Sequence, residues 1–230
     1  DNDCDGSSDE GNPGGGMSCN TGLLGVCSAG TTQCSGGSLM CNQNQSAQAE
    51  ICPDSLDNDC DGMTDETTSM HVADPSFEGG PMGGFWTESS TNFGTPICDV
   101  ASCSAGGGTG PRTGTYWAWF GGINATEMAA VSQSVTLPAG TSATLTFWLE
   151  INACDTTTTD TFAVLVDGLT VFATDNLDPG CGFVGYVLRT VDISSFADGG
   201  SHTLSFEGSF TAGAATTNFF LDDVAISVCD

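Results

Sequence analysis

The stretch Leu56-Asp57-Asn58-Asp59-Cys60-Asp61-Gly62-Met63-Thr64-Asp65-Glu66 decides how the first part of this chain folds. It places five carboxylates within ten residues and has no basic residue to offset them. Carboxylates about 4 Å apart repel by about 1 kcal/mol per pair even in water, so the stretch needs a cation. The start of the chain repeats it as Asp1-Asn2-Asp3-Cys4-Asp5-Gly6-Ser7-Ser8-Asp9-Glu10.

The spacing of these acids predicts a calcium loop in each copy. Aspartates at the first, third and fifth positions, followed by glycine at the sixth, reproduce the first half of an EF-hand loop. The twelfth position is Thr68 or Asn12 and not a bidentate glutamate, and no amphipathic helix flanks either copy, so the loops resemble those of thrombospondin type 3 repeats. The predicted ligands are Asp57, Asp59, Asp61, Met63, Asp65 and Glu66 in one copy and Asp1, Asp3, Asp5, Ser7, Asp9 and Glu10 in the other.

A solvated acidic loop without an ion is the alternative at both copies. Copper and zinc are less favoured than calcium, because hard oxygen ligands prefer calcium, magnesium or manganese. The sequence thus predicts Ca²⁺ as the cofactor.

The charge balance excludes two classes of partner. The 230 residues include 2 Lys plus Arg and 29 Asp plus Glu, which gives a net charge of −27. Nucleic acid and anionic membranes are therefore excluded as electrostatic partners. With 39% hydrophobic residues, the chain is expected to form a real core and not to be disordered.

The twelve cysteines predict a disulfide framework in an extracellular protein. A zinc ribbon would require C-x₂-C pairs, which the sequence lacks. No apolar run approaches the roughly 20 residues needed to cross a bilayer, so membrane insertion is not expected, and the chain is expected to be a processed product or part of a longer one. The predicted disulfide cysteines are Cys4, Cys19, Cys27, Cys34, Cys41, Cys52, Cys60, Cys98, Cys103, Cys154, Cys181 and Cys229.

Residues 17–66 resemble a known repeat. The residues that carry the resemblance are Thr21-Gly22-Leu23-Leu24-Gly25-Val26-Cys27, Cys41-Asn42-Gln43, Glu50-Ile51-Cys52 and the acidic loop. They are similar to the MopE-type metal-binding repeat of large secreted bacterial proteins. The resemblance implies a metal loop but not the identity of the metal, and Pro53-Asp54-Ser55 departs from the usual turn. Large apolar residues are too few here for a core, so disulfides and calcium are expected to stabilise an irregular fold.

The remainder of the chain predicts a β-sandwich. Residues 144–149 alternate polar and apolar side chains, and Asp167-Gly168 between residues 161–166 and 169–172 is a hairpin signal. Further strands are expected at residues 116–120, 130–135, 186–191, 202–206 and 219–227. Without a convincing amphipathic helix, these short strands indicate a mainly β fold with an antiparallel jelly roll.

The expected organisation has four parts. Residues 1–16 form the first calcium loop with a glycine-rich linker, and residues 17–66 form the Cys-rich domain. Residues 67–71 form a linker, and residues 72–230 form the jelly roll.

The second domain resembles extracellular jelly rolls such as MAM and galactose-binding-like modules. The resemblance rests on Asp74-Pro75-Ser76-Phe77-Glu78, on the segment from Gly110 to Gly122, and on Phe220-Leu221-Asp222-Asp223-Val224. It implies that Glu78, Asp222 and Asp223 hold a structural cation between the first and last strands. That would make two or three calcium ions in all. An exposed glutamate with a capped strand end is the alternative.

Catalytic signals are weak, and no enzyme activity is expected. His71 and His202 lie outside known catalytic motifs, and Glu127, Glu150, Asp160 and Glu207 give no separation to test as a glycosidase pair. A glycan platform of Arg112, Tyr116, Trp117 and Trp119 competes with ordinary packing, because Trp117 and Trp119 share one strand face and Tyr116 shares the other with Phe120. Asn44 and Asn124 lie in N-glycosylation sequons.

Local disulfides are expected between Cys98 and Cys103 and between Cys154 and Cys181, with Cys52 closing onto Cys60. Cys4 and Cys229 would then pair, either within one chain or head to tail between copies, and the latter arrangement builds fibres. The sequence therefore favours a calcium-stabilised structural or adhesive protein of an extracellular filament or surface layer, with copies of itself as partners. The alternative is a carbohydrate-binding module with a polysaccharide partner.

Overall fold

The computed structural model describes residues 15–35, 38–48, 50, 54–64, 67–69, 72–140 and 142–229. The chain divides into two compact units. Residues 1–68 with 229–230 form the first, here called the Cys-rich unit, and residues 69–228 form the second, here called the sandwich unit.

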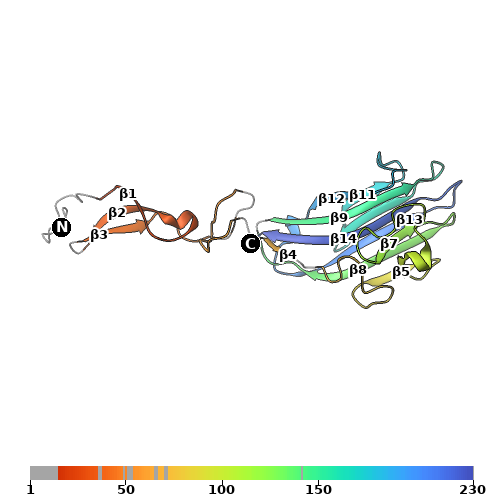
Figure 1. The fold of residues 1–230 in the computed structure, drawn as a ribbon, viewed down its shortest axis with the longest axis horizontal. Helices are drawn as coiled ribbons and strands as arrows, with labels where there is room; N and C mark the ends of the chain where they lie inside the picture. Colours follow the sequence, from red (N-terminus) through yellow and green to blue (C-terminus); the bar gives the residue numbers. More distant parts are fainter. Residues whose placement is uncertain are drawn as a thin grey trace. The chain divides into compact units, whose positions relative to one another are not determined.

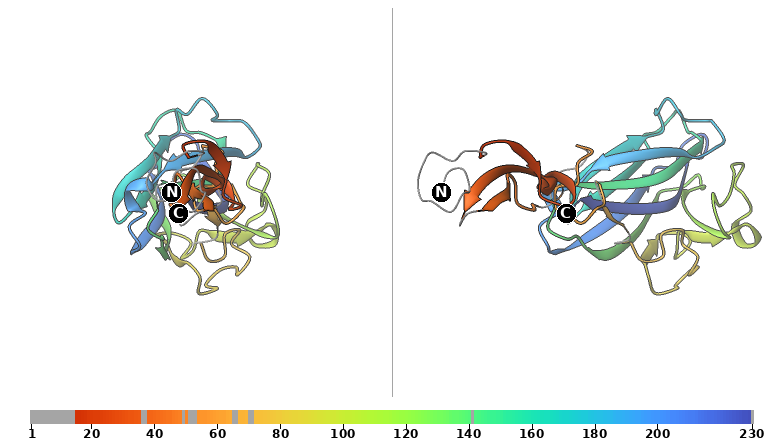
Figure 2. Two further views of the ribbon diagram at one scale, coloured as in Figure 1. Left: turned by 90° about the vertical axis from the view of Figure 1, so that its left-hand side faces the viewer. Right: turned by 60° about the vertical axis from the view of Figure 1, so that its left-hand side comes forward.

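The Cys-rich unit contains a small sheet where irregular structure was expected. Strands β1 (Ser18–Asn20), β2 (Ala29–Ser35) and β3 (Ser38–Gln43) pair antiparallel in that order, and the 3₁₀ turn η1 (Gly25–Ser28) precedes β2 (red to orange in Figure 2). A disulfide between Cys19 and Cys41 joins the outer strands, and one between Cys27 and Cys60 joins η1 to the acidic loop. Leu39 and Met40 remain exposed, so the unit is stabilised by disulfides more than by an apolar core.

The sandwich unit consists of two antiparallel sheets (Figure 1). Strand order in the first is β11-β10-β13-β8-β5, with bounds Leu169–Asp175, Thr161–Val166, Ser201–Phe210, Glu127–Thr136 and Thr87–Ser90. Strand order in the second is β12-β9-β14-β7-β6, with bounds Val187–Asp192, Ser142–Ala153, Asn218–Cys229, Tyr116–Gly121 and Ile97–Asp99. Strand β4 (Thr67–Ser69) also pairs with β14, and the short helices are α1 (Val100–Cys103) and η2 (Ser194–Phe196).

The core lies between the two sheets and follows the period-two pattern of the sequence. On β9 the inward residues Leu145, Phe147 and Leu149 are buried, and on β13 Leu204 and Phe206 meet them. Phe147 and Phe206 pack edge to face with centroids 5.5 Å apart. Burial of alternate side chains of both sheets defines a β-sandwich.

All eight strands expected from the sequence are present. The predicted hairpin is confirmed, since Asp167 and Gly168 have φ values of 51° and 76° and Val166 pairs with Leu169. Strands β5 and β6 were not predicted, because both are short and β5 is polar. Within the described part of the chain, no helix has the length and apolar character to span a bilayer.

A glycine-rich segment, residues 105–110, lies over the outer face of the second sheet. A Cβ atom on Gly106 would come within 2.5 Å of the Trp119 ring, and one on Gly108 within 2.3 Å of Glu150 Oε1. The glycines therefore let the backbone approach the sheet closely, and Thr109 N–H donates to Glu150 Oε1 at 3.0 Å.

Candidate functional site

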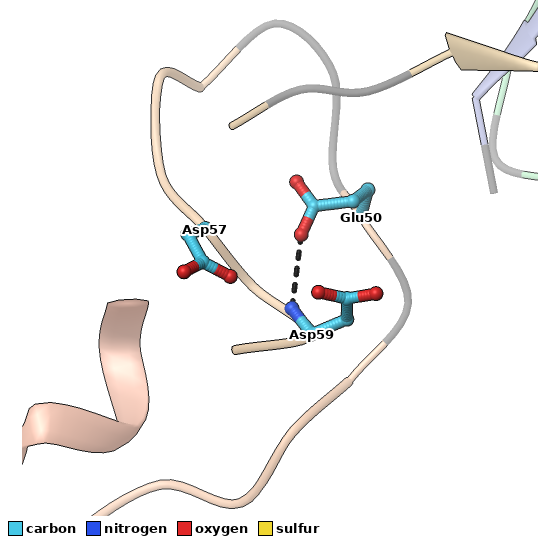
Figure 3. Close-up of side chains that lie close together, drawn as sticks. All are labelled: Glu50, Asp57 and Asp59. Atoms are coloured by element: carbon cyan, nitrogen blue, oxygen red, sulfur yellow. Dashed lines mark hydrogen bonds between the residues drawn. The ribbon is translucent and has the colours of Figure 1, made fainter. Parts of the chain in front are cut away.

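Three carboxylates of the Cys-rich unit converge on one point. Glu50, Asp57 and Asp59 each offer an oxygen that lies within 4.8 Å of the other two, and their carboxyl groups face one another in Figure 3. Glu50 and Asp57 are buried, with exposed fractions of 1% and 8%, and Asp59 is exposed. Two buried carboxylates beside a third favour a divalent cation.

The backbone around the acidic loop positions these groups. Glu50 Oε1 accepts the N–H groups of Asn58 and Asp59 at 2.6 and 2.9 Å. Asp57 Oδ2 accepts the N–H of Gly62 at 3.0 Å, and Gly62 has a φ of 101°, which explains the glycine at the sixth position of the motif. The loop is thus preformed around its acids.

One oxygen of Asp57 indicates that the cluster fits a cation. Among the residues that the structure describes, the buried Asp57 Oδ1 has no hydrogen-bond partner. An unpaired buried carboxylate oxygen costs free energy that a cation would recover. Calcium accepts such oxygens in irregular geometry, so Glu50, Asp57 and Asp59 are the residues that would hold it.

This cluster corrects part of the predicted ligand set. Asp57 and Asp59 are brought together, whereas Asp61 Oδ1 accepts the N–H of Met63 at 2.8 Å and neither residue joins the group. Asp65, Glu66 and the whole first copy, Asp1, Asp3, Asp5, Ser7, Asp9 and Glu10, lie outside the described residues.

Glu50 was not predicted as a ligand. Its signal was present, because Glu50 belongs to the segment that resembles the MopE-type repeat, but it lies seven positions before Asp57 and outside the EF-hand spacing. Pairing of Cys52 with Cys60 was wrong, since Cys60 is bonded to Cys27. That bond holds the acidic loop beside η1, where Val26 N–H donates to the Asp57 carbonyl.

The acids of the third predicted cation site are engaged by the protein. Among the described residues, Glu50, Asp57 and Asp59 are the one acidic group with oxygens within 4.8 Å of one another, and Glu78, Asp222 and Asp223 do not form such a group. Glu78 Oε1 accepts the N–H groups of Thr115 and Tyr116 at 2.7 and 2.9 Å. The Arg112 guanidinium forms an ion pair with Asp223, so this chain supplies its own cation there.

Asp222 is fully buried beside that ion pair. Its oxygens accept N–H groups from Arg112, Thr113 and Asp223 at 2.7, 3.1 and 2.8 Å. Burial raises the pKa of Asp222 to about 7, and the nearby Asp223 charge adds to the increase, although the hydrogen bonds oppose it.

The aromatic platform is largely packed into the fold. Trp117 is fully buried, Tyr116 packs against the main core, and the Arg112 guanidinium carbon lies 3.7 Å from the centroid of the Trp148 ring. The predicted alternation is correct, since Ala118 and Phe120 face the core while Trp117 and Trp119 lie in a second cluster. Trp119 is only half-buried, and its Nε1 donates to Asn218 Oδ1 at 3.1 Å.

Trp119 lines a pocket of about 440 Å³ in the sandwich unit. Phe93 contributes a second aromatic ring that is 58% exposed, and α1 contributes Ser102. None of the described lining residues carries a charge; they are Pro81, Phe93, Thr95, Pro96, Ile97, Cys98, Ser102, Cys103, Trp119, Gly121 and Gly122. This volume lies within the range of small-molecule sites.

The residues weighed for catalysis are engaged in the fold. Glu127 accepts hydrogen bonds from Ser90 and Thr91 at 2.6 and 3.1 Å. His202 lies between two carboxylates, with Nδ1 2.8 Å from Asp167 Oδ2 and Nε2 3.1 Å from Asp198 Oδ1. The hydrogen bond to Asp167 holds the pKa of His202 above its usual value. His71 lies outside the described residues.

The predictions about the remaining cysteines and the two sequons have mixed outcomes. The Cys154–Cys181 disulfide is confirmed, while Cys98 and Cys103 are free thiols. Cys34 and Cys229 are disulfide-bonded, and Cys4 and Cys52 lie outside the described residues. Both sequon asparagines, Asn44 and Asn124, are exposed.

Comparisons with known proteins find no related sequence: no protein-family model and no curated protein matches the chain. Membership in the MopE-type and MAM-like families therefore remains a prediction.

Solved structures with a similar fold include carbohydrate-binding modules and an adhesin domain. TmCBM61, solved with β-1,4-galactotriose, is 19% identical over 68% of this chain and 96% of its own, with a TM-score of 0.48. A family 16 carbohydrate-binding module is 19% identical over 68% and 99%, with a TM-score of 0.40. The K1 adhesin domain of Lys-gingipain from Porphyromonas gingivalis is 14% identical over 72% and 99%, with a TM-score of 0.44. At these sequence identities and TM-scores the similarity concerns the fold alone. The ligands of these proteins are not thereby ligands of this chain.

Proposed function

We propose that this chain is a secreted adhesive protein whose sandwich unit binds a neutral saccharide. The observation that carries the proposal is the open pocket that contains Trp119 and Phe93 and has no charged residue among its described lining. Aromatic rings pack against the C–H face of a sugar, and the hydroxyls of Thr95 and Ser102 lie at the same pocket. The role is one of binding, not of catalysis.

The charge of the chain narrows the ligand class. A net charge of −27 disfavours anionic polysaccharides as ligands. A neutral ligand avoids that repulsion and needs no charged partner in the pocket. The eight described cysteines in disulfides favour an extracellular location, where such a ligand is met.

The Cys-rich unit is proposed to bind calcium through Glu50, Asp57 and Asp59. The unpaired Asp57 Oδ1 supports this role, and the cation would stabilise a unit with little apolar core. Assembly into a filament through Cys4 and Cys229 remains a prediction, because Cys4 lies outside the described residues.

Saccharide binding is tested with the full chain and a panel of neutral oligosaccharides in calorimetry. Phe93→Ala removes an exposed aromatic ring of the pocket and should weaken binding by about tenfold. Phe85→Ala is the matched control, since Phe85 is 52% exposed in the same unit but does not line the pocket, and it should bind like the wild type. Equal affinities of the two variants, or no binding of any neutral sugar, would refute the proposal.

A further inference from the structure

Two thiols in the pocket wall have no assigned role. Cys98 lies on β6 and Cys103 ends α1, and both line the pocket that contains Trp119. Among the described cysteines these two are free, whereas the other eight are in disulfides. A free pair is unusual in a chain whose other described cysteines are oxidised.

The fold brings the two thiols together. Strand β6 passes directly into the single turn of α1, whose N-cap Asp99 accepts the N–H of Ser102 at 2.8 Å. Ser104 N–H closes the turn on the Val100 carbonyl at 3.0 Å. This turn brings Cys103 back to the buried cluster that contains Cys98, and Cys103 packs against that cluster.

We propose that Cys98 and Cys103 form an oxidisable pair whose disulfide fixes the wall of the saccharide pocket. The oxidant is a small-molecule disulfide acting by thiol–disulfide exchange. The Cys103 thiolate attacks one sulfur of the oxidant, forms a mixed disulfide and releases one small thiolate. Cys98 then attacks the Cys103 sulfur and releases the second. The two protons pass to the released thiolates, so two protein thiols are oxidised and one small disulfide is reduced to two thiols.

Exposure sets the order of these steps. Cys103 is half-buried and opens to the pocket, while Cys98 is only 6% exposed. Burial raises the pKa of Cys98 well above its usual value, and the neighbouring Cys103 and the Asp99 charge raise it further. Cys98 is therefore a poor first nucleophile and acts as the resolving thiol.

Oxidation would change the pocket through Ser102 and Cys103. A disulfide would restrict the conformations of the turn at residues 99–103. Ligand binding would then lose less conformational entropy, because this part of the pocket wall is already ordered. This consequence rests on the proposed saccharide binding, whereas the oxidation itself does not.

The first experiment treats the full chain with oxidised glutathione, blocks remaining thiols and maps the peptides. A linked Cys98–Cys103 peptide is expected, and low concentrations of a monothiol should reduce it while Cys19–Cys41 and Cys154–Cys181 remain intact. Complete blocking of both thiols after oxidation would overturn the proposal.

The second experiment compares the oxidised wild type with the Cys98→Ser, Cys103→Ser double variant, which keeps the other disulfides. Amide exchange of Ser102 and Ser104 should be at least about tenfold slower in the oxidised protein, and neutral sugar should bind about three- to tenfold more tightly. Equal exchange rates would refute the fixed wall even if no sugar binds. Equal sugar affinity would refute the effect on binding, and failure of both proteins to bind sugar would count against the proposed function alone.

Discussion

Asp222 shows how a single arginine changes the role of an acidic cluster. The resemblance to extracellular jelly rolls implied a cation between Glu78, Asp222 and Asp223, and in the structure the Arg112 guanidinium forms an ion pair with Asp223. Its backbone N–H also donates to Asp222 at 2.7 Å. Sequence spacing places acids near one another but does not show which of them an internal guanidinium reaches.

The buried Asp222 predicts that stability falls as pH rises. Its folded pKa of about 7 exceeds the usual value of 3.8, so between these pH values the folded protein holds a proton that the unfolded chain releases. The free energy of unfolding of the sandwich unit should therefore fall from about pH 4 to about pH 7, and His202, whose pKa is also raised, adds a loss in the same direction as pH passes through its folded pKa.

Asp222→Asn should flatten this dependence, as measured by urea unfolding across the range. Asp192→Asn is the control, because the pKa of Asp192 is lowered by its hydrogen bond to Ser194 and its contribution is lost only under acidic conditions. An unchanged slope in Asp222→Asn would contradict the buried-proton explanation.

The sequence predicted two of the three residues of the candidate metal site. Asp57 and Asp59 followed from the loop spacing, because alternate residues of a tight loop point inward. Glu50 could not be derived from that rule, since its position depends on the chain returning to the loop after β3 and on the Cys27–Cys60 cross-link.

The strands were the most predictable elements. Alternation of apolar residues specified the eight long strands, because one face of each is buried in the sandwich. Strand β6, with three residues, carries too short a pattern to detect, and β5 pairs with β8 through the polar residues 87–90. Edge strands such as these form because a neighbour offers hydrogen bonds and not because their sequence demands it.

The close packing of the glycine-rich segment on the second sheet predicts that a larger residue at Gly108 destabilises the sandwich unit. Gly108→Ala would place a methyl group 2.3 Å from Glu150 Oε1 and 2.7 Å from the Phe220 ring. Overpacking of this kind costs about 1–3 kcal/mol, measured as a decrease in the free energy of unfolding.

Gly180→Ala is the control, since the nearest atom to its added methyl group, Asp178 Oδ1, lies at 3.1 Å and not at 2.3 Å. It should cost less than Gly108→Ala. Similar losses in the two variants would contradict the close approach of the segment to the sheet as the cause.

The division into two units predicts two thermal transitions. The sandwich unit has an extensive core, whereas the Cys-rich unit depends on cross-links and on the proposed cation. At millimolar calcium and a dissociation constant near 10⁻⁵ M, binding would stabilise the Cys-rich unit by about 2.7 kcal/mol. Chelation should therefore lower its transition and leave that of the sandwich unit unchanged in calorimetry.

Asp57→Asn should reproduce the effect of chelator in the presence of calcium, because it removes a charge from the buried ligand. Asp61→Asn is the comparison, since Asp61 lies outside the cluster, and it should retain most of the calcium effect. Insensitivity of both transitions to chelator would contradict the calcium role.

The ion pairs of the two arginines affect how the protein withstands digestion. Trypsin cleaves after lysine and arginine, and this chain offers Arg112 and Arg189 alone. Arg112 is paired with Asp223 and packs on Trp148, and Arg189 lies on β12 paired with Asp178. Arg112 lies in an exposed segment before β7, so a trypsin-like protease should cut there first, whereas cleavage after Arg189 requires β12 to separate from β9.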